Sequence, residues 1–307
     1  MSDYEDVCAL VPTRNEAKTI GEVVDGLYAV GVGHVLVVDG HSTDGTDEIA
    51  REHGAEVFEQ TGSGKGNAVR EGVAHTDRAY VLLLDGDGTN PPELAPRLLD
   101  PLLEGRAEHV VGDRTADIKP GAMSRLNRVG NRLINASFRR IHGEEYGDIL
   151  SGYRAFTRDS FERMFLSAEG FGIETEMAVE CARHDIPVAV VPTTYEARPA
   201  GSETNLHPIS DGARIILTLY SLAKTSNPLF YFGSVGGLFG AVGGALAAYV
   251  GYEWFVRSIS HEALTVVAGV MLLLGVQLLV VGVLSDIVVS LHREQRQRIE
   301  ALRERVE

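Results

Sequence analysis

Two aspartates that lie two positions apart, Asp85 and Asp87, are the residues of this sequence best placed for metal chemistry. They follow the apolar run AYVLLL at 79–84, and in extended backbone the side chains at positions i and i+2 point the same way. Converging carboxylates repel each other unless a cation lies between them, and their oxygens suit a hard divalent ion. Mg²⁺ or Mn²⁺ held by two carboxylates usually completes its coordination with diphosphate oxygens, so the pair predicts a metal–diphosphate site.

A glycine-rich segment at 62–66 carries one lysine, Lys65. It lacks the longer spacing before Gly-Lys-Ser/Thr that a phosphate-binding P-loop requires. The residues alone leave two interpretations open, a loop that contacts a nucleotide and a plain turn.

The elements that must position these residues alternate between strand and helix. Short apolar runs at 7–11, 34–38, 57–58, 79–84 and 109–112 predict strands, and the segments 17–30, 46–53 and 66–75 between them have helical character. This alternation predicts an α/β fold with a parallel, doubly wound sheet, in which ligands bind beyond the carboxyl ends of the strands. Polar residues follow the strands at 13–16, 39–40 and 85–87, where such a site is expected.

The carboxyl-terminal third is different in character, because it contains two long apolar runs. The run 229–255 has Glu253 as its only charge, and the run 263–285 has none. At 1.5 Å per residue the second run spans roughly 34 Å, enough for a hydrocarbon core of ~30 Å. We expect a catalytic domain at 1–208, a juxtamembrane amphipathic helix at 209–227, two transmembrane helices at about 229–256 and 263–289, and a charged tail at 292–307.

Composition narrows the possible partners. With 43 acidic against 28 basic residues the net charge is −15, which disfavours nucleic acid as a partner. Two cysteines, Cys8 and Cys181, are too few for a disulfide framework or a four-cysteine zinc site. The scarcity of lysine in an acidic chain fits either a high-salt cytoplasm or a GC-rich genome, and composition does not separate the two.

The motifs around these residues resemble family 2 glycosyltransferases of the GT-A fold. In chain order they are Val11-Pro12-Thr13-Arg14-Asn15-Glu16, Val37-Val38-Asp39-Gly40, Gly64-Lys65-Gly66 and Asp85-Gly86-Asp87. Further on, Gly112-Asp113-Arg114, Asp148 with Ser151-Gly152-Tyr153-Arg154, and Glu174-Thr175-Glu176 are similar to the polyprenyl-phosphate branch, which includes dolichyl-phosphate mannose and glucose synthases. The acidic composition and the two-span end are most similar to the archaeal dolichyl-phosphate hexosyltransferases of S-layer N-glycosylation.

The resemblance implies a GT-A (Rossmann-like) catalytic domain and a role for each matching residue. Nucleotide-sugar binding is implied for Pro12, Thr13, Arg14, Glu16, Asp39, Lys65, Asp85 and Gly86. Catalysis is implied for Asp85, Asp87, Arg114 and Arg154, with Asp85 and Asp87 holding Mg²⁺ or Mn²⁺. Contact with the acceptor phosphate or lipid is implied for Ser151 and Arg198.

The implied reaction is inverting transfer of a hexose to dolichyl phosphate as the first step of lipid-linked glycan assembly. UDP-glucose is the favoured donor, and GDP-mannose and a sugar-hydroxyl acceptor in polysaccharide synthesis are the alternatives. A polysaccharide synthase usually carries a Gln-x-x-Arg-Trp motif, which this sequence lacks. The family also often has Gln or Glu where Thr89 stands, and a loop lysine where this chain has Glu203 or Thr204 after Arg198.

A second cluster of arginines lies on one predicted helix. Arg125, Arg128 and Arg132 fall at i, i+3 and i+7, with an adjoining apolar stripe of Leu126, Val129, Leu133 and Ile134. A basic amphipathic helix can lie in a membrane interface with its arginines at the phosphate level. We expect this segment to contact the lipid bilayer and the acceptor phosphate; the alternative is a solvated basic face paired with surface acids.

Charge bias predicts the topology of the membrane segments. The acidic start of the chain has no signal-peptide pattern, the tail after the second span carries five arginines, and the loop between the spans has only Arg257. The catalytic domain and the carboxyl terminus are therefore expected on the cytoplasmic side of the cell membrane. Contacts between the transmembrane helices of two chains would allow a homo-oligomer, which is a further expectation.

We predict that a cysteine introduced at Ser260 reacts with a membrane-impermeant maleimide in intact cells, whereas one introduced at Ser2 does not. Labelling of single-cysteine variants, each compared with lysed cells as the control for reactivity, measures this. Protection at Ser260 together with labelling at Ser2 would reverse the orientation.

Overall fold

The computed structural model describes residues 4–170, 172–198 and 227–303, together with 217, 220, 223 and 224; for 292–303 it describes the backbone alone. The chain divides into two compact units, Met1–Leu219 and Tyr220–Glu307. The expected juxtamembrane helix at 209–227 and the loop that follows Arg198 lie almost entirely outside the described residues.

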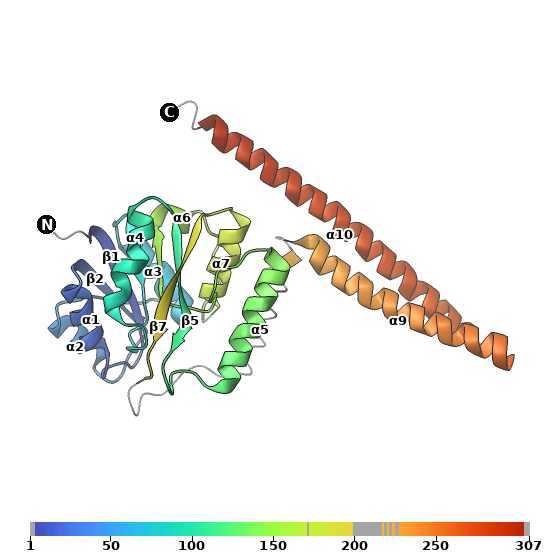
Figure 1. Ribbon diagram of the computed structural model, residues 1–307, viewed down its shortest axis with the longest axis horizontal. Coiled ribbons are helices and arrows are strands. Elements are labelled where there is room, and N and C mark those ends of the chain that lie inside the picture. The colour runs from blue at the N-terminus through green and yellow to red at the C-terminus, as the bar shows by residue number, and fades with distance from the viewer. Residues whose placement is uncertain are drawn as a thin grey trace. The chain divides into compact units, whose positions relative to one another are not determined.

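The first unit is built on a mixed sheet of seven strands (Figure 1). The strands are β1 (Tyr4–Thr13), β2 (Val32–Asp39), β3 (Glu56–Glu59), β4 (Tyr80–Leu83), β5 (His109–Ile118), β6 (Arg154–Thr157) and β7 (Val188–Tyr195). Their order is β3-β2-β1-β4-β6-β5-β7, and only β6 runs antiparallel to its neighbours. The expected mostly parallel α/β fold is confirmed.

Helices cover both faces of this sheet because successive strand residues point to opposite sides. Val7, Ala9 and Val11 of β1 join a buried cluster with α1 (Ile20–Ala29) and α4 (Ala95–Leu103). Leu10 points to the other face, where it lies against Gly72 of α3 (Lys65–His75). The remaining helices of this unit are α2 (Thr46–Glu52), the short 3₁₀ helix η1 (Pro92–Leu94), α5 (Arg125–His142), α6 (Arg158–Glu162) and α7 (Ile173–Arg183).

The strand order reverses at β1, which has β2 on one side and β4 on the other. The carboxyl ends of β1 and β4 are therefore neighbours, and the backbone N–H of Leu84 donates to the carbonyl of Leu10 at 3.2 Å. In doubly wound folds ligands bind at such a switch point. This arrangement places the loop that contains Glu16 beside the turn that contains Asp85 and Asp87.

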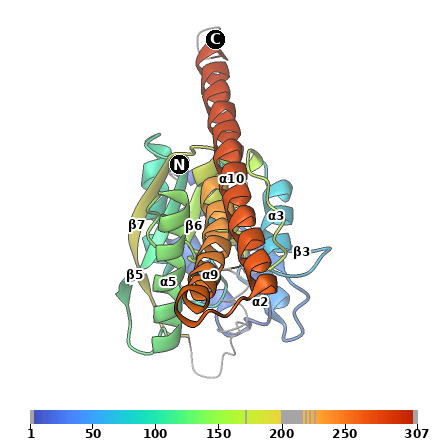
Figure 2. The ribbon, with the colours of Figure 1, turned by 90° about the vertical axis from the view of Figure 1, so that its right-hand side faces the viewer.

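The second unit consists of two long helices, α9 (Pro228–Arg257) and α10 (Glu262–Arg303), which lie side by side (Figures 1 and 2). Glycines allow close approach of their backbones: a Cβ built on Gly236 would come within 2.8 Å of the carbonyl oxygen of Gly275. Within the described residues, Pro228–Arg257 and Glu262–Leu291 are long and apolar enough to cross a membrane. The expectation of two apolar helices after the sheet domain is confirmed.

Candidate active site

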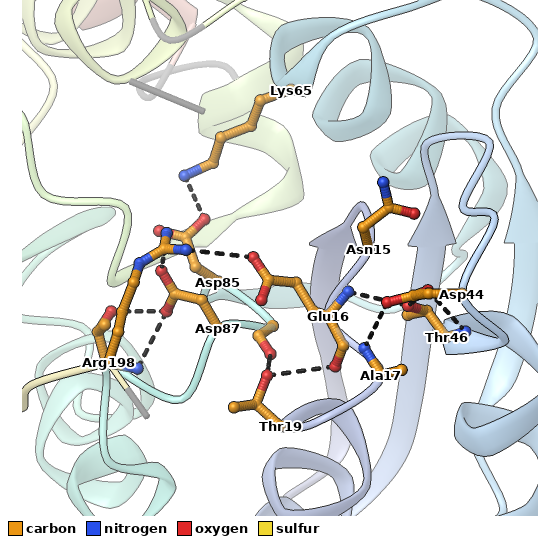
Figure 3. Close-up of polar contacts among 12 residues, drawn as sticks. Asn15, Glu16, Ala17, Thr19, Asp44, Thr46, Lys65, Asp85, Asp87 and Arg198 are labelled. Atoms are coloured by element: carbon orange, nitrogen blue, oxygen red, sulfur yellow. Dashed lines mark hydrogen bonds and ion pairs between the residues drawn. The ribbon is translucent and has the colours of Figure 1, made fainter. Parts of the chain in front are cut away.

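Three carboxylates gather at the switch point of the sheet. Glu16 follows β1, and Asp85 and Asp87 follow β4 (Figure 3). The expectation that extended backbone aligns the two aspartates is wrong, because β4 ends at Leu83 and the chain turns at 86–87 before Gly88, whose φ is +71°. A tight turn, rather than the pleat of a strand, brings them to the site.

Asp87 is held from two sides and is only 5 % exposed. Its Oδ1 accepts from the hydroxyl of Thr89 at 2.6 Å and from the Thr89 backbone N–H at 3.0 Å. Its Oδ2 accepts from Arg198 at 2.5 Å, and the same guanidinium lies 3.4 Å from Glu16 (Figure 3). Thr89, which stands where the family often has Gln or Glu, thus orients Asp87.

The crowding of acids shifts the pKa of Glu16. Burial raises the pKa of Glu16, and the negative charges of Asp87, Asp85 and Asp44 raise it further. The positive charge of Arg198 lowers it in part, and the resulting pKa is about 7. The protonation of Glu16 therefore changes near neutral pH.

Lys65 lies inside the site rather than at a nucleotide-facing rim. Its ammonium is paired with Asp85 and, at 2.6 Å, with Glu174, and its side chain is only 10 % exposed. Burial by itself lowers the pKa of Lys65, but the attraction of Asp85 and Glu174 outweighs it and the pKa lies above its ordinary value. Lys65 thus fixes Asp85, and its implied contact with the nucleotide stays a prediction.

Two glycines allow close packing around this ion pair, Gly66 against the 168–169 loop and Gly152 against the pair itself. A Cβ on Gly66 would lie 2.0 Å from the carbonyl oxygen of Ala168, and a Cβ on Gly152 would lie 2.6 Å from both Asp85 Oδ2 and Lys65 Nζ. The loop that packs on Gly66 is held by Glu176, which accepts from the backbone N–H groups of Ser167 and Ala168, both at 2.8 Å. Glu174 and Glu176 thus have separate structural roles.

The loops after β1 and β2 are bonded to each other beside the acid cluster. The backbone N–H of Glu16 donates to Thr46 Oγ1 at 2.9 Å, and that of Ala17 donates to Asp44 at 3.1 Å (Figure 3). Asp39 accepts from the backbone N–H and the hydroxyl of Ser42, at 2.9 and 2.5 Å. This cradle contains the residues implied in nucleotide binding: Pro12 and Thr13 are buried at the end of β1, Arg14 is exposed, and Gly86 lies against Thr13.

Arg114, Ser151 and Arg154, the polar residues of the later motifs, differ in burial and in partners. Arg114 donates through Nε to Asp148 at 2.7 Å and stacks over the ring of Tyr195. Arg154 is fully buried and donates to the carbonyls of Ser151 and Ile149 at 2.9 and 2.7 Å. A substrate-contacting role for Arg154 or for the hydroxyl of Ser151, which is also fully buried, therefore conflicts with the structure. Both support the turn that contains Gly152.

The arginine helix forms as expected, with one correction. In α5, Arg125, Arg128 and Arg132 are exposed, and the stripe of Leu126, Val129 and Leu133 is 58, 63 and 55 % exposed. Ile134 does not belong to that stripe, because it is buried in the domain with Phe138 and Ile141. The outer face of α5 is thus both basic and apolar.

We predict that Lys65→Met destabilises the protein by about 3 kcal/mol, because it leaves two carboxylates facing each other without their shared cation. The matched control is Lys119→Met, which removes an exposed ion pair with Asp117 and should leave the free energy of unfolding essentially unchanged. Denaturant unfolding of the purified protein with a chelator present measures both. If the two substitutions lower the free energy of unfolding equally, the Lys65 ammonium does not have this structural role.

Comparisons with known proteins place this geometry in context. The profile of glycosyl transferase family 2 matches residues 8–165. Glycosyltransferase AglJ of Haloferax volcanii is 61 % identical over 98 % of this chain and 100 % of its own length, and the dolichyl-phosphate hexose transferase of the same organism is 36 % identical over 69 % of this chain and 91 % of its own.

Among solved structures, glucosyl-3-phosphoglycerate synthase from Mycobacterium tuberculosis in complex with Mn²⁺ and UDP-glucose is similar, with a TM-score of 0.59 and 25 % identity over 71 % of this chain and 78 % of that one. The shared sheet is the GT-A fold, as the motifs implied. With a family match over more than half of its length and relatives covered almost completely, the chain belongs to glycosyl transferase family 2.

Proposed function

We propose that this glycosyltransferase transfers a hexose, with glucose favoured, from a UDP-sugar to dolichyl phosphate at the cytoplasmic face of the cell membrane. The observation that carries the proposal is the acid pair Asp85 and Asp87 at the switch point. Lys65 forms an ion pair with Asp85, and Arg198 forms one with Asp87. The relatives named for transfer to a dolichyl-phosphate acceptor and for binding Mn²⁺ with UDP-glucose support the same chemistry.

The residues fit a divalent ion that is completed by its substrate. Two aspartates offer hard oxygen ligands, and among the described residues no cluster of three or more His, Cys, Asp or Glu forms a closed metal cage. Asp85 and Asp87 would hold Mg²⁺ or Mn²⁺ together with the diphosphate of the donor. When bound, the ion would stabilise the negative charge of the departing nucleoside diphosphate as a Lewis acid.

The acceptor explains why no dedicated base is required. Dolichyl phosphate is a phosphate monoester with a second pKa near 6, so it is largely dianionic at pH 7 and already nucleophilic. A sugar hydroxyl would instead need a general base. One in-line attack by the phosphate oxygen on the anomeric carbon breaks the bond to the nucleotide and inverts the configuration. We infer that Arg114 and Arg198 bind phosphate oxygens of the two substrates during this attack, because a guanidinium group offers paired donors to such oxygens.

The outer face of α5 is suited to hold the acceptor. Beside this face, a cleft of about 640 Å³ is lined by Arg128 and Arg132, by Asn131 and Asn135 of the inner face of α5, and by Ile118 of β5. The exposed stripe of Leu126, Val129 and Leu133 continues this mixed surface. We infer that the helix lies at the bilayer surface, with its arginines at the lipid phosphate.

The direct test of the donor uses membranes that contain the full chain. Radiolabelled UDP-glucose, UDP-N-acetylglucosamine and GDP-mannose are incubated separately with dolichyl phosphate, and the lipid phase is extracted. Label from UDP-glucose in the lipid supports the proposal. Label from GDP-mannose alone would identify a mannose synthase, and label confined to water-soluble glycan would identify a sugar-hydroxyl acceptor.

We predict that Asp87→Ala lowers transfer by at least about 100-fold, the equivalent of roughly 3 kcal/mol, because the metal loses one of its two carboxylates. The control is Asp100→Ala, which removes an exposed aspartate of α4 and should leave kcat unchanged. Near-normal turnover of Asp87→Ala in saturating Mn²⁺ would count decisively against the metal assignment.

For the acceptor side, Arg125→Gln, Arg128→Gln and Arg132→Gln, made singly, should raise the KM for dolichyl phosphate by about 5- to 20-fold with little change in the KM for the nucleotide sugar. Arg158→Gln, which breaks an exposed pair with Glu162 elsewhere on the domain, is the matched control. A rise confined to the donor KM would move these arginines to the donor site, and no change in either KM would leave them as solvated surface charges.

A further inference from the structure

The inner face of α5 carries a row of asparagines that lies beside its exposed arginines and opposite the stripe of Leu126, Val129 and Leu133. Asn131 is 5 % exposed, and its Nδ2 donates to Asp148 Oδ1 at 2.9 Å. Asn135, one turn on, donates to Asn131 Oδ1 and accepts at 2.9 Å from the backbone N–H of Ile149. The chain of hydrogen bonds therefore runs from α5 into the loop that contains Asp148.

Asp148 is fully buried, so each of its bonds matters to its orientation. Oδ1 accepts from Asn131 and, at 3.2 Å, from the backbone N–H of Leu150. Oδ2 accepts from Nε of Arg114. Burial lowers the pKa of the Arg114 guanidinium, but its attraction to Asp148 outweighs this and holds the pKa above its ordinary value.

The guanidinium of Arg114 is therefore held at its Nε edge and on one of its planar faces. Asp148 occupies its Nε and the ring of Tyr195 covers its plane, with the ring centroid 5.0 Å from Cζ. None of the described residues accepts a hydrogen bond from its two terminal nitrogens, and the guanidinium lies within the electrostatic influence of Asp85. Those terminal nitrogens are the donors that a phosphate oxygen would meet.

We propose that Asn131 is a positioning residue: by fixing the carboxylate of Asp148, it directs the terminal nitrogens of Arg114 toward the phosphate groups beside Asp85. This proposal rests on the proposed function, since it assumes that Arg114 binds a phosphate oxygen during transfer. It also gives α5 two roles. Its exposed arginines meet the acceptor, and its buried Asn131 sets the orientation of Arg114.

The test compares Asn131→Ala and Asn131→Asp in the purified full-length enzyme, with Ser137→Ala as the control. Ser137 lies on the same helix, and its hydroxyl donates to the carbonyl of Leu133 at 2.8 Å. Asn131→Ala should lower kcat by about 10-fold with both KM values within about twofold, because the lost alignment matters as charge develops on the phosphate. Asn131→Asp keeps the side-chain volume but replaces the donor with a repelling carboxylate, so its kcat should fall further.

A double-mutant cycle separates positioning from general support of the fold. In an Arg114→Met background, Asn131→Ala should lower kcat by less than about twofold, because it acts through the guanidinium that is gone. If the two losses instead multiply, or if Asn131→Ala changes only a KM, the proposal is wrong.

A crystal structure of the Asn131→Ala protein gives a readout that does not depend on transfer. The guanidinium of Arg114 should leave its position between Asp148 and Tyr195; an unmoved Arg114 would overturn the positioning role. Absence of transfer to dolichyl phosphate by the wild-type enzyme would refute the proposed function alone, and this structural comparison would still decide the role of Asn131.

Discussion

Charge balance at the switch point is the constraint on which the rest of the catalytic unit depends. The fold brings the ends of β1 and β4 together, and with them Glu16, Asp85 and Asp87. In a chain of net charge −15, this concentration of acid needs cations supplied from elsewhere in the fold. Lys65 arrives from the start of α3 and Arg198 from the segment after β7, and each bridges two carboxylates.

The same constraint explains why the arginines of the motifs differ in role. Arg198 spans the acid cluster directly, whereas Arg114 is oriented by a buried aspartate and keeps its terminal nitrogens for a ligand. Arg154 has no carboxylate partner among the described residues; burial lowers its pKa, and it donates to main-chain carbonyls and to His109. Burial also lowers the pKa of His109 well below its usual range, so the imidazole is neutral and can accept from Arg154.

Local patterns were sufficient to predict the sheet, the two apolar helices and the position of Asp85 and Asp87 after a strand, because each depends on residues that are close in sequence. The turn that brings the two aspartates to the site was not predicted. The partners of the charged residues were not predictable in this way: Arg114 and Asp148 are 34 positions apart, and Arg198 and Asp87 are 111 apart. Lys65 and Glu174 were both visible in motifs, but only the packing of Gly66 on the 168–169 loop brings them together. One signal was available and unused: Asn127, Asn131 and Asn135 recur every fourth residue and mark the inner face of α5.

We propose that Asp85 and Asp87 hold the divalent ion that binds with the donor, and that Arg198 competes with this ion for Asp87. Titration of the purified full-length protein with Mn²⁺, followed by the electron paramagnetic resonance signal of the free ion with and without UDP, tests it most directly. We expect one Mn²⁺ per chain in the presence of UDP and loss of that binding in Asp87→Asn. Without UDP, Arg198→Gln should bind Mn²⁺ more tightly than the wild type, because Asp87 Oδ2 no longer accepts from the guanidinium. Binding of Mn²⁺ with UDP that is equally tight in the wild type and in Asp87→Asn would contradict it.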